Sequence, residues 1–356
     1  TCWTCKSPDV PRVMNEIGIA EFYSGSWEEL GHQIVNPIGC ADCHDANSMD
    51  LKITRPALVE AFERRDMDIH RTSHQERRRL VCAQCHVEYY FKGEGKYLTF
   101  PWDEGTSVEA MEAYYDKFDF KDWIHPISKA PMIKAQHPDY EIFMTGIHAQ
   151  RGLACADCHM PYTEQGGVKF TDHKIVSPLY FVEKTCMVCH TESQEELFAN
   201  VYERQDKIKQ SQHRLEKILV RAHMEAGKAW ELGATEEEMT AALQDIRHAQ
   251  WKWDFVTASH GASFHSPIEC NRILAEGIYE AQEARVKLSK ILVSKGYNQT
   301  VPYPDIETKA KAQEFVGLDM EKLNSQKEKF LEEVVPEWAK KADEREQGYQ
   351  VSRNTK

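Results

Sequence analysis

Apolar residues recur at helical spacing along the second half of the chain. Val201, Ile208, Leu215 and Ala222 stand seven residues apart, which is the spacing of a coiled-coil seam. The pattern predicts a long helix that ends at Gly233. Long helices of this kind mostly pack within their own chain, and a homodimer interface is a second use that the length of the seam allows.

Turn and cap signals predict three further helices. A capping box at Thr235–Glu238 starts the next helix, and Ser266–Glu269 forms another box with proline at the first helical position. We expect the helix after the second box to run to Gly296. A proline-rich link then leads to a last helix over about 307–343, and the charged tail beyond Lys340 is expected to fray.

The first half of the chain has weak periodicity and many loops rich in Pro, Gly, Asp and aromatic residues. It predicts short helices, with turns at Gly93–Gly95 and Gln165–Gly167. Such a pattern is typical of a region that packs around cofactors. We therefore expect a mainly α protein with two parts, residues 1–192 and the long helices of residues 193–356.

Five cysteine pairs dominate the chemistry of the first part, because ten of the eleven cysteines stand in C-x-x-C units. In four units a histidine follows at once, which is the attachment signature of a c-type haem. In the first unit a lysine follows. The motif residues are Cys2, Cys5, Lys6, Cys40, Cys43, His44, Cys82, Cys85, His86, Cys155, Cys158, His159, Cys186, Cys189 and His190.

The motif with lysine in place of histidine indicates that the five haem c groups have different functions. An iron held by two histidines passes electrons but has no position for a substrate, whereas an iron held on one side can bind one. A ligating lysine must be neutral, because metals select the deprotonated form. We therefore interpret the Lys6 haem as the reaction site and the other four as its electron relay.

Two other uses of cysteine pairs fit the sequence less well. Zinc sites also use C-x-x-C, but they do not need a histidine directly after the second cysteine. Cysteines three residues apart are poorly placed to form disulfides across a fold. The remaining cysteine, Cys270, is expected to be a buried thiol without a function.

Charge and hydropathy restrict the partners and the compartment. The net charge of −13 leaves no basic patch for nucleic acid. No apolar run reaches the roughly 18 residues that a membrane helix needs. Because bacteria attach haem c outside the cytoplasm, we expect a periplasmic protein, and we expect this chain to lack N-terminal residues of the full protein.

Bis-histidine haems need distal ligands as well. The chain has 16 histidines, four of them in motifs. Composition alone does not choose among the other twelve, although His148 and His173 are well placed in local order. The helical histidines His213, His223 and His248 are expected to be surface or capped residues.

The motif set resembles pentahaem cytochrome c nitrite reductase, the ammonia-forming enzyme. The resemblance rests on C-x-x-C-K followed by four C-x-x-C-H motifs, together with His86–Tyr90 and Lys134–His137, and it covers nearly the whole chain. It implies a multihaem cytochrome c fold with a haem-packed N-terminal part and long C-terminal helices. It also implies a membrane-anchored quinol-oxidising multihaem cytochrome, or a soluble multihaem protein, as electron donor, and the long helices lead us to expect a homodimer.

The resemblance assigns roles to individual residues. Lys6 would be the proximal ligand of the active haem, with Tyr89 and His137 in the distal pocket. A calcium ion would take the Glu88 carboxylate, the Tyr89 and Lys134 carbonyls and the Gln136 side-chain oxygen, which is a hard oxygen set. The implied distal ligands of the fifth, second and fourth haems are His148, His173 and His265.

The implied activity is the six-electron reduction of nitrite to ammonium, with hydroxylamine and sulfite as further substrates. The family's pocket arginine and the distal histidine of the third haem lie upstream of the first motif, so neither falls within this chain. Two alternatives stay open. In a pure electron carrier, both axial positions of all five irons would be occupied by protein ligands. Another multihaem oxidoreductase, of the hydroxylamine- or tetrathionate-converting type, would carry more attachment motifs.

Overall fold

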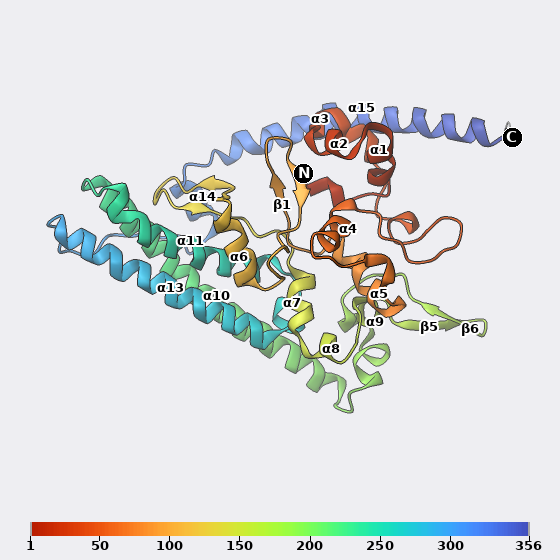
Figure 1. Cartoon of the computed structure of the whole chain (residues 1–356), viewed down its shortest axis with the longest axis horizontal. Coiled ribbons are helices and arrows are strands. Elements are labelled where there is room, and N and C mark those ends of the chain that lie inside the picture. Colours follow the sequence, from red (N-terminus) through yellow and green to blue (C-terminus); the bar gives the residue numbers. More distant parts are fainter. Residues whose placement is uncertain (1, 355–356) are drawn as a thin grey trace. The chain divides into compact units, whose positions relative to one another are not determined.

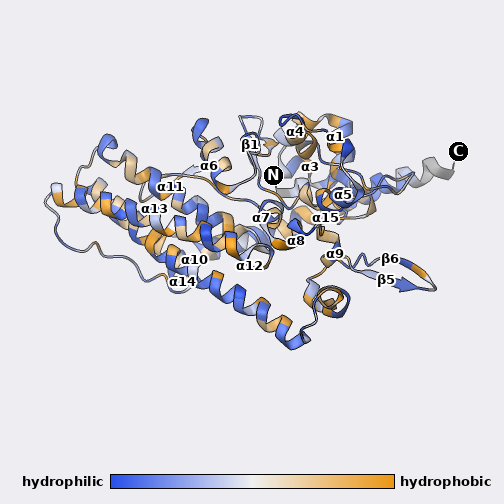
Figure 2. Ribbon diagram, turned by 60° about the horizontal axis from the view of Figure 1, so that its bottom comes forward, coloured by the Kyte–Doolittle hydropathy of each residue, from blue (hydrophilic) through white to orange (hydrophobic). Residues whose placement is uncertain are grey.

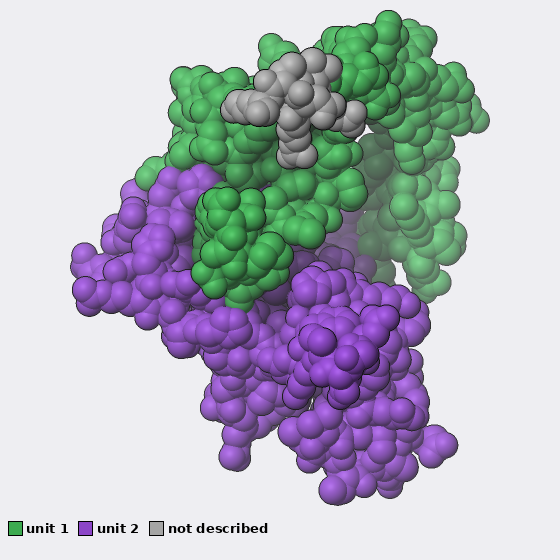
Figure 3. Space-filling model, turned by 90° about the vertical axis from the view of Figure 1, so that its right-hand side faces the viewer, with its two compact units in different colours: residues 1–54, 91–98, 302–356 green, residues 55–90, 99–301 purple. Residues whose placement is uncertain are grey.

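The computed structural model describes residues 2–354, and the side chains of residues 3–349. The chain is mainly α-helical, as predicted, and it forms two compact units (Figure 3). Unit 1 comprises residues 1–54, 91–98 and 302–356, and unit 2 comprises residues 55–90 and 99–301. The boundaries of these units differ from the boundary expected near residue 192. That residues 1–192 bind the haems stays a prediction.

Unit 1 combines the N-terminal segment with the C-terminal helices. Its elements are η1 (Cys2–Cys5), α1 (Asp9–Ile17), α2 (Ile19–Ser24), α3 (Trp27–Leu30), η2 (Gly31–Gln33), η3 (Cys40–Asp42), α14 (Lys309–Phe315) and α15 (Met320–Asn354). Aromatic rings pack together in this unit. The partly exposed Trp27 lies edge-on against the buried Trp3 and Trp338 at centroid distances of 5.1 and 5.3 Å. Such pairs are stabilising beyond the area they bury.

The prediction of one last helix over 307–343 with a frayed end was wrong. Gly317, at φ +72°, separates α14 from α15, because a left-handed backbone stops a helix. Beyond Lys340 the helix continues, since Ala342 is buried and the Arg345 guanidinium donates to the His32 carbonyl at 2.8 Å. Tertiary contacts of a charged segment therefore order what local sequence predicts to fray.

Unit 2 holds the remaining helices (Figure 1). Its helices are α4 (Pro56–Glu63), η4 (Ile69–Arg71), α5 (His74–Ala83), α6 (Val108–Lys117), α7 (Asp139–Thr145), α8 (Ile147–Gln150), α9 (Cys155–His159), η5 (Pro178–Lys184), η6 (Cys186–Val188), α10 (Gln194–Glu231), α11 (Glu236–Ala258), α12 (Ala262–His265) and α13 (Pro267–Ser294). The described strands pair in short hairpins. In unit 2, β3 (Trp123–Ile124) pairs with β4 (Pro131–Met132), and β5 (Tyr162–Gln165) pairs with β6 (Val168–Thr171), whereas the hairpin of β1 (Tyr90–Lys92) and β2 (Tyr97–Thr99) falls mainly in unit 1.

The long helices α10, α11 and α13 lie side by side and bury their apolar stripes against one another (Figures 1 and 2). The predicted seam residues Ile208, Leu215 and Ala222 are at most 2% exposed. Gly277 of α13 lets Leu215 approach closely, because an added Cβ would lie 2.8 Å from Leu215. The seam is therefore used inside the chain and is not available as a dimer interface.

Two predicted caps had different outcomes. The capping box at Thr235 and Glu238 is confirmed. The box at Ser266 was wrong, although proline does open α13, because the Ser266 side chain makes no cap hydrogen bond. Ser266 also ends α12, where its N–H donates to the Ala262 carbonyl, and Glu269 pairs with Arg272 instead. Among the described helices, none has both the length and the apolar run needed to cross a membrane.

Candidate functional site

The C-x-x-C-H motifs fold as single tight turns. In the second, third and fifth motifs the histidine N–H donates to the carbonyl of the first cysteine at 2.8–2.9 Å, and the fourth motif is α9. Residues three and four apart lie on one face of such a turn, so both thiols and the imidazole face the same side. This is the arrangement that two thioether bonds and one axial ligand to a single porphyrin require.

Hydrogen bonds set the tautomers of the motif histidines. Nδ1 of His44 lies 2.7 Å from the Met49 carbonyl, and Nδ1 of His159 lies 3.1 Å from the Val176 carbonyl. A carbonyl only accepts, so Nδ1 carries the proton and Nε2 presents its lone pair. Nδ1 of His86 faces the Asp139 carboxylate at 3.4 Å, and Nδ1 of the predicted distal ligand His173 lies 2.9 Å from the Thr171 carbonyl. Metal-bound histidines have this kind of partner.

Two predicted axial pairs have the spacing that a shared iron needs. The His159 and His265 ring centroids are 6.3 Å apart, and the His148 and His190 centroids are also 6.3 Å apart. With metal–nitrogen bonds of about 2 Å and imidazole nitrogens about 1.2 Å from their ring centres, two rings on one metal have centroids about 6 Å apart. Nδ1 of His265 is also buried without a partner. These residues therefore fit haem.

The first motif is fixed by its tryptophan. Trp3 is 4% exposed, and the Lys6 N–H donates to the Trp3 carbonyl at 2.9 Å. The Lys6 side chain is exposed at the end of this turn, where the other motifs carry histidine. The Cys2 side chain lies outside the described residues, and Cys5 is half-buried.

The short segment Lys134–Gln136 contains two of the predicted calcium ligands. Its three backbone N–H groups donate hydrogen bonds to three carboxylates. The Lys134 N–H donates to Asp122 at 2.7 Å, the Ala135 N–H to Asp254 at 2.9 Å and the Gln136 N–H to Glu88 at 2.6 Å. The Gln136 side-chain amide lies 3.3 Å from the Lys134 carbonyl. Three of the four predicted ligand residues are thus brought together in an oxygen-rich site. Asp254 is already paired with the Lys134 ammonium group at 2.9 Å, whereas Glu88 and Asp122 remain available to balance a calcium ion.

Glu88 is the most deeply placed of these groups. It is fully buried, and it accepts from the Tyr115 hydroxyl at 3.1 Å besides the Gln136 amide. Burial raises the pKa of Glu88 well above its usual range, the Gln136 hydrogen bond lowers it, and the charge of Glu141 raises it further. The hydrogen bonds from Gln136 and Tyr115 stabilise the charged form of Glu88 only in part against burial, and a bound metal ion would supply the remaining compensation.

Tyr89 and His137, the predicted distal-pocket residues, belong to unit 2, and Lys6 belongs to unit 1. Tyr89 is 3% exposed, and His137 is half-buried. The His137 ring is nearly parallel to the ring of His260, at a centroid distance of 5.8 Å. His260 was not singled out from the sequence, which contains no motif that marks it.

The three helical histidines differ from one another. His213 is exposed beside Glu216, as expected. The expectation was wrong for His223, which is 8% exposed, stacks on His125 at 3.9 Å and hydrogen-bonds to Ser128. Burial lowers the pKa of His223 to about 3, so it is a neutral core residue. Cys270 is a buried thiol that donates to the Ala262 carbonyl, as expected.

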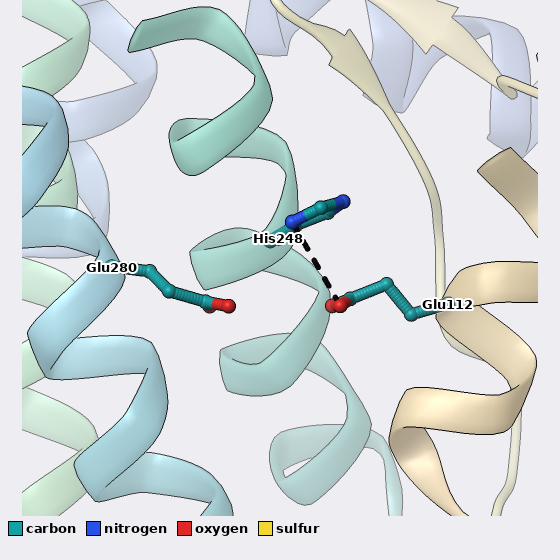
Figure 4. Close-up of side chains that lie close together, drawn as sticks. All are labelled: Glu112, His248 and Glu280. Carbon is teal, nitrogen blue, oxygen red and sulfur yellow. Dashed lines mark ion pairs between the residues drawn. The ribbon is translucent and has the colours of Figure 1, made fainter. Parts of the chain in front are cut away.

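One further cluster has metal-ligand geometry. Glu112, His248 and Glu280 come from α6, α11 and α13 and point toward one another (Figure 4). The Nζ of Lys252 lies 2.6 Å from Glu112 and 2.8 Å from Glu280. An ammonium group therefore already takes the position of a cation, and the cluster is a buried ion network.

Sequence reasoning missed Asp139, which is 8% exposed and contacts three groups that the motifs do not connect. Its Oδ1 accepts from the Ser259 hydroxyl at 2.6 Å and from the Gly261 N–H at 3.2 Å, and its Oδ2 faces His86. The only signal in the sequence is its place two residues after His137.

Comparisons with known proteins agree with these observations. The family model described as cytochrome c552 matches residues 1–349. A cytochrome c-552 of Porphyromonas gingivalis is 61% identical over 96% of this chain and 69% of its own length. A cytochrome c-552 of Aliarcobacter butzleri is 48% identical over 97% of this chain and 71% of its own length.

A solved structure is similar to most of the chain. It is the cytochrome c nitrite reductase of Desulfovibrio desulfuricans, whose catalytic subunit is described with two calcium sites. The two structures align with a TM-score of 0.77 and 33% sequence identity, over 85% of this chain and 68% of that one. The predicted multihaem cytochrome c fold is thereby confirmed.

Proposed function

Because the chain belongs to the cytochrome c552 family, which includes the cytochrome c nitrite reductases, we propose that it reduces nitrite to ammonium at a haem c ligated by Lys6. In the net reaction, nitrite takes up six electrons and eight protons and yields ammonium and two water molecules. The haem iron supplies the coordination position for nitrite and transmits the electrons, which come from a multihaem cytochrome donor.

The observation that carries this proposal is Lys6 itself. It stands in a cysteine turn where four sister motifs hold histidines, and its side chain is exposed. One attachment motif thus has a lysine as its axial ligand. At two other motifs, the ring of the motif histidine lies at the distance from a second histidine that a shared iron needs, which supports bis-histidine ligation there. We infer that His148, His173 and His265 close the irons of the fifth, second and fourth haems, which then relay electrons.

Tyr89 and His137 are proposed to donate hydrogen bonds and protons to the oxygens of nitrite as the N–O bonds break. Proton donors held in position lower the barrier of such steps, and donors aimed at developing oxygen charge stabilise it electrostatically. His137 is supported by its ring contact with His260 and by the hydrogen bond from the Asp139 N–H to its carbonyl at 2.7 Å.

We further propose a calcium ion at Glu88, with the Tyr89 and Lys134 carbonyls and the Gln136 side-chain oxygen as ligands. The carboxylates that fix Lys134–Gln136 support this assignment. The ion would balance the buried Glu88 charge and raise the local positive potential, which favours entry of an anion into an acidic protein.

A homodimer is proposed on the outward face of α13. Tyr279, Val286 and Val293 are spaced by seven residues and are 60%, 48% and 56% exposed. An exposed apolar stripe at this spacing fits a second copy of the same helix. Replacing Val286 by glutamate is expected to shift the protein to monomer in sedimentation velocity, and an unchanged dimer would contradict this interface.

We place the protein in the periplasm, where haem c is attached, with a membrane-anchored quinol-oxidising cytochrome or a soluble multihaem protein as donor. Hydroxylamine, and also sulfite, are expected as further substrates of the same pocket.

The experiment that tests the function is product analysis. The full-length protein is supplied with reduced viologen and limiting nitrite, and ammonium is quantified. Near-stoichiometric ammonium is expected, and Lys6→His should change nitrite turnover. Untouched nitrite would favour an electron carrier, and nitric or nitrous oxide would mean that Tyr89 and His137 are not the distal residues.

A further inference from the structure

Asp139 contacts two functional segments of unit 2 through its two carboxylate oxygens. Oδ1 accepts from the Ser259 hydroxyl at 2.6 Å and from the Gly261 N–H at 3.2 Å. Oδ2 faces Nδ1 of His86, a motif histidine, at the long distance of 3.4 Å. The two oxygens thus have separate partners, and each connection can be tested by itself.

The Oδ1 side holds the segment that carries His260. Because Ser259 and Gly261 flank His260 and both donate to Asp139, the His260 ring is kept beside the ring of His137, two residues before Asp139. Gly261 also lies against His265, since an added Cβ would be 2.2 Å from its Cε1. The hydrogen bonds to Asp139 Oδ1 therefore also fix the backbone that packs against His265, an expected axial ligand of the fourth haem.

The Oδ2 side acts on His86. A carboxylate that faces Nδ1–H fixes the ring orientation and tautomer of a metal-bound histidine and raises its basicity. Hydrogen bonding of this kind is one of the means by which a protein tunes a haem. Among the described motif histidines, His86 and His190 have a carboxylate facing Nδ1, from Asp139 at 3.4 Å and from the neighbouring Glu192 at 3.6 Å, where His44 and His159 have carbonyls.

We propose that Asp139 is a positioning residue that couples the axial ligand of the third haem to the His137–His260 pair. It touches neither substrate nor iron and acts through these histidines. The inference rests on the proposed function for its effect on nitrite turnover, whereas its effect on His86 requires only that haem is bound at Cys82–His86.

The test uses Asp139→Asn and Ser259→Ala in the fully haem-loaded protein, with haem content measured first. Asp139→Asn removes the charge that faces His86. We expect the midpoint potential of the third haem to shift to a more positive value, with altered EPR g-values, and kcat for nitrite to fall about tenfold with little change in KM. Ser259→Ala leaves Oδ2 and His86 in place. It should lower kcat without moving the third-haem potential.

Asp206→Asn, an exposed change of the same kind on α10, is the matched control and should alter neither property. Unchanged EPR spectrum and potential in haem-complete Asp139→Asn protein would overturn the coupling to His86. If that variant does not assemble, Ser259→Ala decides the case, and an unchanged kcat there overturns the proposal. A native protein that makes no ammonium would refute the proposed function, while the third-haem shift would still test the role of Asp139.

Discussion

The imidazole rings of His159 and His265 lie with their centroids 6.3 Å apart and their planes 79° apart. His159 is a motif histidine and His265 comes from α12, so the fold brings together two residues that are distant in the chain. The spacing leaves room for one iron between the two rings.

Replacing His265 by alanine should therefore open one haem. We expect one additional high-spin haem per chain in the EPR and absorption spectra, and carbon monoxide binding at that haem after reduction, because a five-coordinate iron has a free position. His213→Ala, on the exposed face of α10, should leave the spectra unchanged. A low-spin spectrum identical to that of the native protein would show that His265 is no axial ligand.

Lys252 is the cation of a buried network, and its loss should destabilise the bundle. Its side chain is 1% exposed between Glu112 and Glu280, which are 12% and 16% exposed. Lys252→Met leaves the Glu280 carboxylate without its ammonium partner and Glu112 with His248 alone, and removal of one member of a buried pair costs about 3–5 kcal/mol. Denaturant unfolding of the holoprotein measures the loss.

The matched control is Lys207→Met. Lys207 and Glu203 form an ion pair on α10 with both side chains more than 60% exposed, so its removal should change stability by less than about 1 kcal/mol. Equal effects of the two substitutions would mean that burial does not decide the strength of the Lys252 network.

The long helices could be predicted from the sequence because their signals are local. Apolar spacing, Gly233 and the Thr235 capping box act within a few residues, and α10 ends and α11 begins close to the predicted positions. Ser266 shows the limit. It has the right neighbours for a capping box, yet its buried position at the end of α12 leaves its side chain no cap hydrogen bond.

The candidate site was predictable where chemistry imposes spacing along the chain, as in the cysteine motifs. It was not predictable where distant segments meet. Asp139 and Ser259 are 120 residues apart, and no local pattern connects them. The buried His223 was missed for the same reason, since its partner Ser128 lies in a loop far along the sequence.

Glu88 should determine calcium binding. Glu88→Gln keeps the shape of the side chain and removes its charge, so a calcium ion would lose the carboxylate among its proposed ligands, which is fully buried. We expect at least a tenfold loss of calcium affinity, since even partners of metal ligands contribute about 10–100-fold. Calorimetric titration of chelator-treated protein measures it. Glu164→Gln, in the exposed β5–β6 hairpin, should bind calcium like the native protein, and an equally tight Glu88→Gln variant would refute the site.

Asp139 should make the free energy of unfolding depend on pH in the acidic range. Burial by itself would raise its pKa, but hydrogen bonds from His86, Ser259 and Gly261 outweigh burial and lower the pKa from 3.8 to about 2. A carboxyl group whose pKa is depressed in the folded state stabilises the fold above its unfolded pKa, and this contribution is lost as the pH falls toward the folded value. The shift corresponds to roughly 2 kcal/mol, present at pH 6 and declining below about pH 4.

Denaturant unfolding of the native protein and of Asp139→Asn between pH 6 and pH 3 isolates this contribution. The native protein should be more stable at pH 6, and the difference should shrink as the pH falls below 4, because the asparagine variant has no proton to take up. Asp206→Asn on α10 should instead follow the native curve throughout. Parallel curves for native protein and Asp139→Asn would show that the Asp139 carboxylate is not held by His86, Ser259 and Gly261 in the folded protein.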